Sequence, residues 1–153
     1  MKINLQVVSL FTFLLAFGSA NANELLVTSA SAKSKSSNAF ALDVSSDGNA
    51  TALQIRLDVG EGLKVDLSKC VSALPSSHTG ACSYKNGRVT VLVHSDRNEL
   101  LPAGIVSIGS ISTAGRSSNA WKISELLAFD RSGNEISISS ILNRGSSDSI
   151  IAK

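Results

Sequence analysis

The stretch Cys82-Ser-Tyr-Lys-Asn-Gly-Arg-Val-Thr-Val-Leu-Val-His94 decides the fold of this protein. The Asn86-Gly87 pair at its centre is typical of a two-residue type I′ turn, because both central residues of that turn require positive φ. After the turn, apolar residues alternate with others, so that Val89, Val91 and Val93 point to one side of a strand. We therefore predict a β-hairpin with one buried face and one solvated face.

The same period of two continues on both sides of this hairpin. Upstream, it runs through Phe40 to Val44 and through Leu53 to Val59, and downstream we expect strands within residues 105–113, 121–129 and 135–142. Turn-forming residues, such as Asp130-Arg-Ser-Gly-Asn134, separate these segments. No apolar stripe of helical period persists for three turns. The pattern predicts an all-β, antiparallel, jelly-roll-like β-sandwich of about eight to nine strands.

Residues 1–22 have the layout of a secretory signal peptide. Lys2 is followed by an apolar run over residues 7–17 and by Ala20-Asn-Ala22, which predicts cleavage after Ala22. The apolar run is shorter than the roughly 18–20 residues that span a bilayer, so we expect no membrane insertion after cleavage. We predict a secreted or periplasmic protein with a sandwich domain over residues 23–142 and a flexible C-terminal tail over residues 143–153.

Export also determines how the two cysteines are interpreted. Cys70 and Cys82 are the only cysteines in the chain. In an oxidising compartment, such a pair indicates a structural disulfide closing a short loop, whereas a redox-active pair has closer spacing, as in Cys-x-x-Cys. We predict the structural bridge.

Composition and motifs exclude several functions. A net charge of +2 is too small for electrostatic binding of nucleic acid. No Gly-x-Ser-x-Gly motif occurs, and the only histidines, His78 and His94, are interpreted as a polar loop residue and a surface strand residue. We predict no catalytic residues, no cofactor and no metal site. The faint calcium-loop pattern that starts at Asp130 is better explained by a hairpin turn.

Carbohydrate binding by a flat aromatic platform is disfavoured. Tyr84 and Trp121 are its only plausible donors, and a lone Trp in a sandwich usually belongs to the core. A polysaccharide groove that relies on polar side chains stays open as an alternative.

Four segments, in this order, resemble the cohesin family, whose relatives include cellulose-binding sandwich modules. They are Ala52-Leu-Gln-Ile-Arg-Leu-Asp-Val59, Asn86-Gly-Arg-Val-Thr-Val-Leu-Val93, Pro102-Ala-Gly-Ile-Val106 and Ser124-Glu-Leu-Leu-Ala-Phe-Asp-Arg-Ser-Gly-Asn-Glu-Ile136. The resemblance implies a jelly-roll sandwich without a catalytic centre that binds dockerin helices on one sheet face. Two features differ from the family: Asp58-Val-Gly-Glu61 replaces its usual Tyr-Asp-Pro, and the loop between the cysteines is not general among cellulosomal cohesins.

If that face is used here, its residues are the outward ones of the matching strands. Alternation assigns them as Gln54, Arg56, Asp58, Arg88, Thr90, Leu92 and His94. The alternative is an ordinary solvated sheet face. We predict a secreted, non-catalytic, cohesin-like module that binds a dockerin-like protein or a polysaccharide. The alternatives are a structural or adhesin subunit of the cell envelope that binds through a sheet edge and, less favoured, an exported hydrolase.

Overall fold

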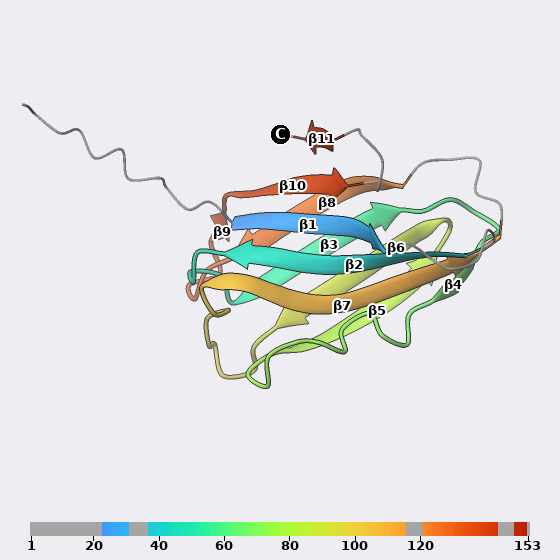
Figure 1. Ribbon diagram of the computed structural model, residues 1–153. Coiled ribbons are helices and arrows are strands. Elements are labelled where there is room, and N and C mark those ends of the chain that lie inside the picture. The colour runs from blue at the N-terminus through green and yellow to red at the C-terminus, as the bar shows by residue number, and fades with distance from the viewer. Residues whose placement is uncertain (1–22, 31–36, 116–120, 144–148, 153) are drawn as a thin grey trace, which may run out of the picture.

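The computed structural model of the protein describes residues 23–30, 37–115, 121–143 and 149–152. The regular structure in this part consists of β-strands in two stacked sheets (Figure 1). None of the described residues belongs to a helix long and apolar enough to cross a membrane. The predicted signal peptide and its cleavage site at Ala22 lie outside the described residues.

The two sheets have different strand orders. The six-stranded sheet has the order β11-β10-β1-β2-β7-β4, from Ser149–Ala152, Ile138–Asn143, Asn23–Ala30, Ser37–Ser46, Gly104–Ala114 and Lys64–Asp66. The five-stranded sheet has the order β5-β6-β3-β8-β9, from Thr79–Lys85, Arg88–His94, Ala52–Asp58, Lys122–Phe129 and Glu135–Ile136. The predicted all-β sandwich is confirmed, with two differences: the described part contains more strands than expected, and β1 pairs with β10 in parallel.

The C-terminal region is arranged differently from the single strand expected over residues 135–142. β9 pairs with β8 in the five-stranded sheet, whereas β10 pairs with β1 in the six-stranded sheet. Ser137 is the one residue between them, so the chain crosses from sheet to sheet at that point. The region expected to be a flexible tail begins at the last residue of β10 and contains β11, which pairs with β10. The flexibility of that tail stays a prediction.

The core lies between the sheets and follows the predicted alternation. Phe40, Leu42 and Val44 of β2 are buried, as are the alternating residues of β3 and β6 that face them: Leu53, Ile55, Leu57, Val89, Val91 and Val93. Trp121 is buried as expected, and its ring stacks on Phe40 with centroids 3.5 Å apart. Each strand of this core therefore exposes its other side chains on the outside of the sandwich.

The hairpin between β5 and β6 has the predicted turn. Asn86 and Gly87 have φ values of 50° and 74°, as a type I′ turn requires. The backbone N–H groups of Val59 and Gly60 donate to the Gly87 carbonyl, and the Tyr84 hydroxyl donates to the Gly60 carbonyl. These bonds hold the hairpin against the end of β3 and fix the relative positions of β5, β6 and β3.

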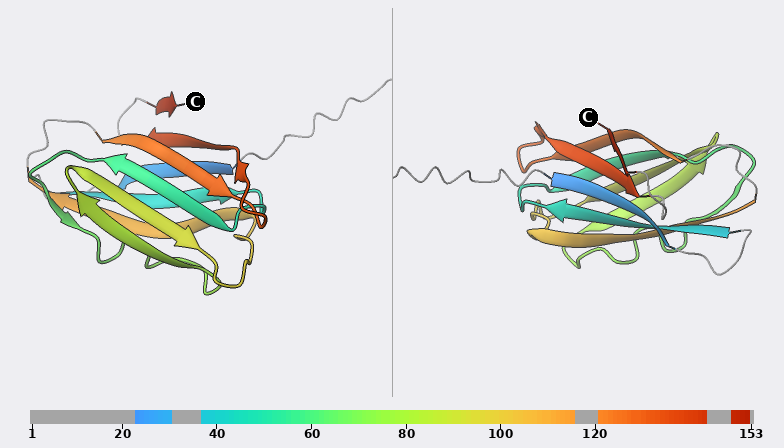
Figure 2. Two further views of the ribbon diagram at one scale, coloured as in Figure 1. Left: turned by 180° about the vertical axis from the view of Figure 1, so that it is seen from behind. Right: turned by 45° about the horizontal axis from the view of Figure 1, so that its top comes forward.

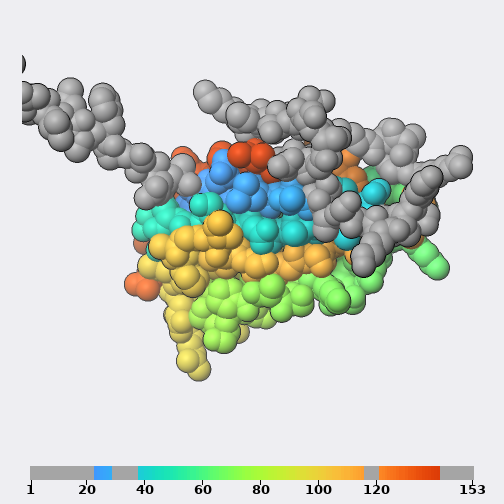
Figure 3. Space-filling model, viewed as in Figure 1, coloured from blue at the N-terminus to red at the C-terminus, as the bar shows by residue number. Residues whose placement is uncertain are grey.

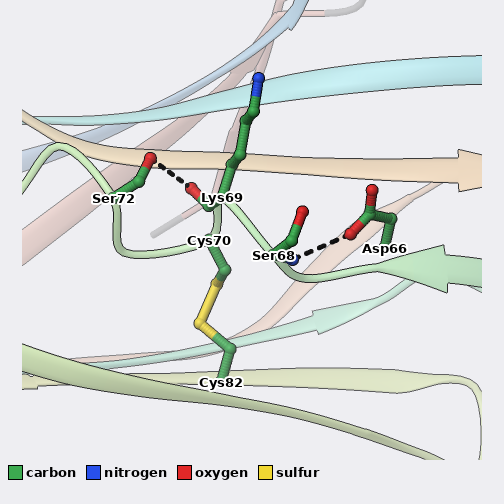
Figure 4. The surroundings of a disulfide bond; sticks show 6 residues. All are labelled: Asp66, Ser68, Lys69, Cys70, Ser72 and Cys82. Carbon is green, nitrogen blue, oxygen red and sulfur yellow. Dashed lines mark hydrogen bonds between the residues drawn. A yellow bond between two sulfur atoms is a disulfide. The ribbon is translucent and has the colours of Figure 1, made fainter.

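The predicted disulfide joins Cys70 to Cys82, with their Cα atoms 6.5 Å apart (Figure 4). Cys82 lies in β5, the edge strand of the five-stranded sheet, and Cys70 lies in the loop between β4 and β5. That loop is also bound to the other sheet, because Ser110 N–H donates to the Lys69 carbonyl and Ala73 N–H to the Ile108 carbonyl. Residues 67–78, named the bridging loop, therefore connect the two sheets along one side of the sandwich, next to β7 in Figure 3.

Two glycines leave space for the bridging loop. A Cβ atom at Gly109 of β7 would overlap the backbone carbonyls of Lys69 and Cys70, and would lie 2.6 Å from the Cys70 carbonyl carbon. A Cβ atom at Gly80 of β5 would lie 2.8 Å from a methyl group of Val71. Real Cβ atoms do not approach other atoms so closely, so the loop can contact β7 and β5 at these positions only because side chains are absent there.

Candidate functional site

The outward side of the five-stranded sheet carries all seven predicted binding residues. We call the outward residues of β5, β6, β3 and β8 the outer face; the left view of Figure 2 looks onto the strands that carry it. The register places Arg88 beside Asp58, Thr90 beside Arg56, and Leu92 beside Gln54. His94 follows at the end of β6. The residues that the sequence predicted to share a face are therefore brought together, and the intervening residues of β3 and β6 are buried.

The outer face carries two ion pairs, and within each pair the two opposite charges neutralise each other. Arg56 Nη1 lies 2.9 Å from Glu125 Oε2, and the Gln54 side-chain amide donates to the same oxygen. One register step away, Arg88 Nε donates to Asp58 Oδ1 at 2.7 Å. Both pairs join neighbouring strands of the sheet, so they restrict four charged side chains and leave those side chains little charge to offer a partner. Lys85 and Lys122 lie in the same row as Arg88 and Asp58 and add positive charge at this end of the outer face.

The Asp58 carboxylate is held in its ionised form. The hydrogen bond from Arg88 lowers the pKa of Asp58, and burial opposes this effect. The Ser124 hydroxyl lowers the same pKa further by donating to Asp58 Oδ1 at 3.1 Å. In return, the hydrogen bond to Asp58 raises the pKa of Arg88. This end of the outer face is therefore an ion pair at any pH near neutrality.

Leu92 is the exposed apolar residue of the outer face, with 42% of its surface accessible. Its register neighbours are Ala81 of β5 and Gln54 of β3, and Gln54 in turn lies beside Leu127 of β8. Ala81, Leu92, Gln54 and Leu127 thus form an uncharged row across the sheet. This row lies between the two ion pairs and His94. Such a row can bury an apolar side chain of a partner protein, because polar groups surround it and no free charge must be desolvated.

The two histidines are in different environments. His94 is exposed, and its Nε2 lies 3.2 Å from Asp96 Oδ1, as expected of a surface residue. The prediction that His78 is simply a polar loop residue was incomplete, because the loop buries it and leaves only 8% exposed. Its Nδ1 is hydrogen-bonded to the Ser77 hydroxyl at 2.9 Å, whereas its Nε2 has no hydrogen-bond partner within the described part of the chain. In that part, no acid orients this histidine as in a catalytic triad.

The structure supports a turn, not a calcium loop, at Asp130. Asp130 Oδ1 accepts hydrogen bonds from the backbone N–H groups of Ser132 and Asn134, and Oδ2 accepts one from the Asn134 side chain. The carboxylate is thus used within its own turn. Across the described ranges, no three His, Cys, Asp or Glu side chains form a group that could hold a metal ion.

Sequence reasoning missed the contribution of β8 to the outer face. Glu125 and Ser124 complete the two charged clusters, yet strict alternation cannot place both on one side. The register between β3 and β8 shifts between Arg56 and Leu57, so Ser124 is an extra residue opposite that step and turns its hydroxyl to Asp58. The only signal for this in the sequence is the polar Ser124-Glu125 pair, since the other residues of the strand are apolar apart from Lys122 at its start.

Comparison with known proteins gives structural matches only. The sequence matches no protein-family model and no curated protein. The fold is similar to a non-cellulosomal cohesin from the archaeon Archaeoglobus fulgidus, with a TM-score of 0.59 and 16% identity over 80% of this chain and 88% of that one. A type II cohesin from Bacteroides cellulosolvens gives a TM-score of 0.56 and 9% identity over 83% and 98% of the two chains.

A further similar structure is that of a type I cohesin–dockerin complex from Clostridium thermocellum. Its matched chain gives a TM-score of 0.55 and 12% identity, over 80% of this chain and 94% of that one. At these identities the likeness concerns the fold. The protein therefore has a cohesin-like β-sandwich, as the resemblance in its sequence implied.

Proposed function

We propose that this protein is a non-catalytic binding module that docks a protein partner on its outer face. The observation that carries the proposal is the exposed Leu92, which lies in a row of uncharged side chains next to the ion pair of Arg56 and Glu125. The Clostridium thermocellum structure is a complex of a cohesin with a dockerin, which supports a dockerin-like partner for this chain. The contact residues are the seven predicted ones together with Glu125 and Ser124.

We further propose that the protein works outside the cytoplasm. The signal-peptide pattern of residues 1–22 and the Cys70–Cys82 disulfide both support export to the periplasm or the medium. Amino-terminal sequencing of the protein recovered from those fractions should give Asn23 as the first residue. Recovery of a protein that still begins at Met1 would contradict this part of the proposal.

The docking proposal is tested with two matched variants. Leu92→Asp places a charge in the uncharged row of the outer face, and Ile105→Asp makes the same change at a large exposed apolar residue of the six-stranded sheet. Wild type and Ile105→Asp, when immobilised, should retain a common protein from the native secretome that Leu92→Asp does not retain. Because Leu92 is only part of the contact, we expect its substitution to weaken the measured affinity by at least about tenfold.

Calorimetry with the purified partner then gives the affinities directly. Urea unfolding of all three proteins is the control, because a surface substitution that leaves the fold intact changes the unfolding transition little. If Leu92→Asp binds the partner as tightly as wild type does, the outer face is not the docking surface.

A polysaccharide is the second candidate ligand, and a separate cleft favours it. The cleft has a volume of about 540 Å³, and polar side chains including Asn49, Arg131 and Ser132 line it beside Leu100 and Ile136. Mixed polar and apolar walls suit a sugar ring, although no aromatic platform is present in this lining. A glycan array with wild type and Arg131→Ala tests this candidate, which predicts binding that the variant loses.

A structural or adhesin role through a sheet edge is the third candidate, and β5 favours it. β5 is the edge strand of the five-stranded sheet, and it contains no proline and only one charged residue, Lys85. The Lys85–Arg88 pair closes the two-residue turn, so by alternation the backbone groups of Gly80, Cys82 and Tyr84 point away from β6. No hydrogen bond among the described residues reaches those groups, which suits addition of a partner strand. This candidate predicts that binding of a partner slows hydrogen exchange of the backbone amides of these three residues.

A further inference from the structure

His78 is a buried titratable side chain that the docking proposal does not use. It closes the corner formed by residues 75–78, where its backbone N–H donates to the Pro75 carbonyl at 2.9 Å, and it directly precedes β5. The side chain is only 8% exposed. One ring nitrogen, Nδ1, pairs with the Ser77 hydroxyl, while the other, Nε2, is enclosed and has no hydrogen-bond partner among the residues that the structure describes.

This arrangement suits a neutral imidazole and not a charged one. If the neutral ring carries its proton on Nδ1, Nδ1 donates to Ser77 and Nε2 presents only an unused lone pair, which costs little. Protonation adds an N–H group at Nε2 together with a positive charge. A buried charge whose hydrogen bonding is incomplete is costly, so protonation of the ring favours a corner that shifts or opens to water.

The charged groups that face His78 come from two neighbouring segments. Burial lowers the pKa of His78, and the charge of His94 on β6 lowers it further. Glu99, in the connection between β6 and β7, opposes this through its carboxylate and its backbone carbonyl. Burial has the largest effect of these. The folded protein therefore binds this proton more weakly than an opened corner does, and acid favours opening.

The corner is directly connected to the outer face. Thr79, the next residue, is the first residue of β5 and pairs with His94. Along β5, the next pair whose side chains lie on the outer face is Ala81 with Leu92. A displacement of His78 therefore loosens the Thr79–His94 end of the outer face, next to the residue that we propose as the apolar contact.

We propose that His78 is a pH-sensitive latch for the outer face. With a neutral ring the corner is closed and the end of β5 is held against β6, whereas mild acid releases the corner and frays that end. A partner that docks on the outer face is then released more easily in acidic surroundings. Only this last consequence rests on the proposed docking function, because the opening of the corner is a property of the protein alone.

The experiment measures the corner in the purified protein without any partner. Nuclear magnetic resonance follows the two imidazoles and the exchange of the Thr79 and His94 amides from pH 7.5 to 5. His78→Phe removes the titrating group while it keeps the corner filled, and His94→Gln is the matched control that removes the other histidine. His78→Asn replaces the first variant if His78→Phe does not fold.

In wild type and His94→Gln, we expect His78 to titrate below the ordinary histidine value of about 6.5. The opening constant of the two amides, corrected for intrinsic exchange, should rise by up to about tenfold per pH unit as the pH falls below that value. The His78 variants should show no such rise. If His78 titrates at or above its ordinary value, or if the His78 variants open with pH as wild type does, the latch is refuted. If the corner opens as expected but Leu92→Asp binds as wild type does, the docking function fails and the latch stands.

Discussion

Substitution of Gly109 by alanine tests how the bridging loop is held against β7. The added Cβ atom would overlap the carbonyl groups of Lys69 and Cys70, which are backbone atoms and cannot rotate away. The loop must therefore move. Its two backbone hydrogen bonds to β7, from Ser110 N–H to Lys69 and from Ala73 N–H to Ile108, are then lost or weakened.

The expected cost follows from these contacts. Two hydrogen bonds at about 1 kcal/mol each give about 2 kcal/mol. Looser packing of Val71 and Leu74, which are half-buried against the core, adds about 1 kcal/mol. We therefore expect Gly109→Ala to lower the free energy of unfolding by about 3 kcal/mol. Urea unfolding followed by the fluorescence of Trp121, the single tryptophan and a buried one, measures it.

Gly62→Ala is the control for the overlap. Gly62 has a φ of +73°, and a Cβ atom there would meet no atom within 4 Å, so only the left-handed backbone is penalised. We expect this variant to lose about 1 kcal/mol. The reasoning is refuted if Gly109→Ala is no more destabilised than Gly62→Ala.

Three further predictions concern the disulfide, the core and the outer face. Replacing Cys70 and Cys82 together by alanine should lower the free energy of unfolding by about 3 kcal/mol, since the bridge closes a short loop. Urea unfolding should give the same free energy for the variant and for reduced wild type. A midpoint equal to that of oxidised wild type would contradict the estimate. Phe40→Ala should lower the free energy of unfolding by about 3–5 kcal/mol and change the near-ultraviolet circular dichroism of Trp121, because it removes a buried stacked ring. A wild-type spectrum together with a wild-type unfolding midpoint would argue against this packing. Asp58 has a lowered pKa in the fold, so its ionised form stabilises the protein above pH 4, and this contribution disappears as the pH falls through the folded pKa. The stability difference between wild type and Asp58→Asn should therefore shrink in acid, and a difference that stays constant as the pH falls from neutrality into the acid range would be inconsistent with it.

The sequence predicts the parts of the fold that depend on local rules. Period-two alternation identifies the buried sides of β2, β3 and β6, because a strand between two packed sheets must place every second side chain in the core. Asn86-Gly87 predicts its turn because few other residue pairs tolerate two positive φ values. The pairing of Cys70 with Cys82 follows from the absence of any other cysteine.

The remaining features depend on contacts between distant residues. Nothing in the alternation of Ile136 and Ile138 reveals that the chain changes sheets at Ser137, since both residues are half-buried in their own sheets. The burial of His78 depends on the course of the bridging loop. The contacts that β8 adds to the outer face, from Glu125 to Arg56 and from Ser124 to Asp58, need the irregular step between β3 and β8, which no pattern within one strand specifies.

The chain joins the two sheets at two margins: at the single-residue crossing at Ser137, and at the bridging loop, which is hydrogen-bonded to β7 and linked to β5 by the disulfide. These connections limit the movement of one sheet against the other, and they favour a surface around Leu92 that is ordered before a partner binds. A surface that is already ordered loses little conformational entropy when a partner binds to it. Most of the ordering on association then occurs in the partner.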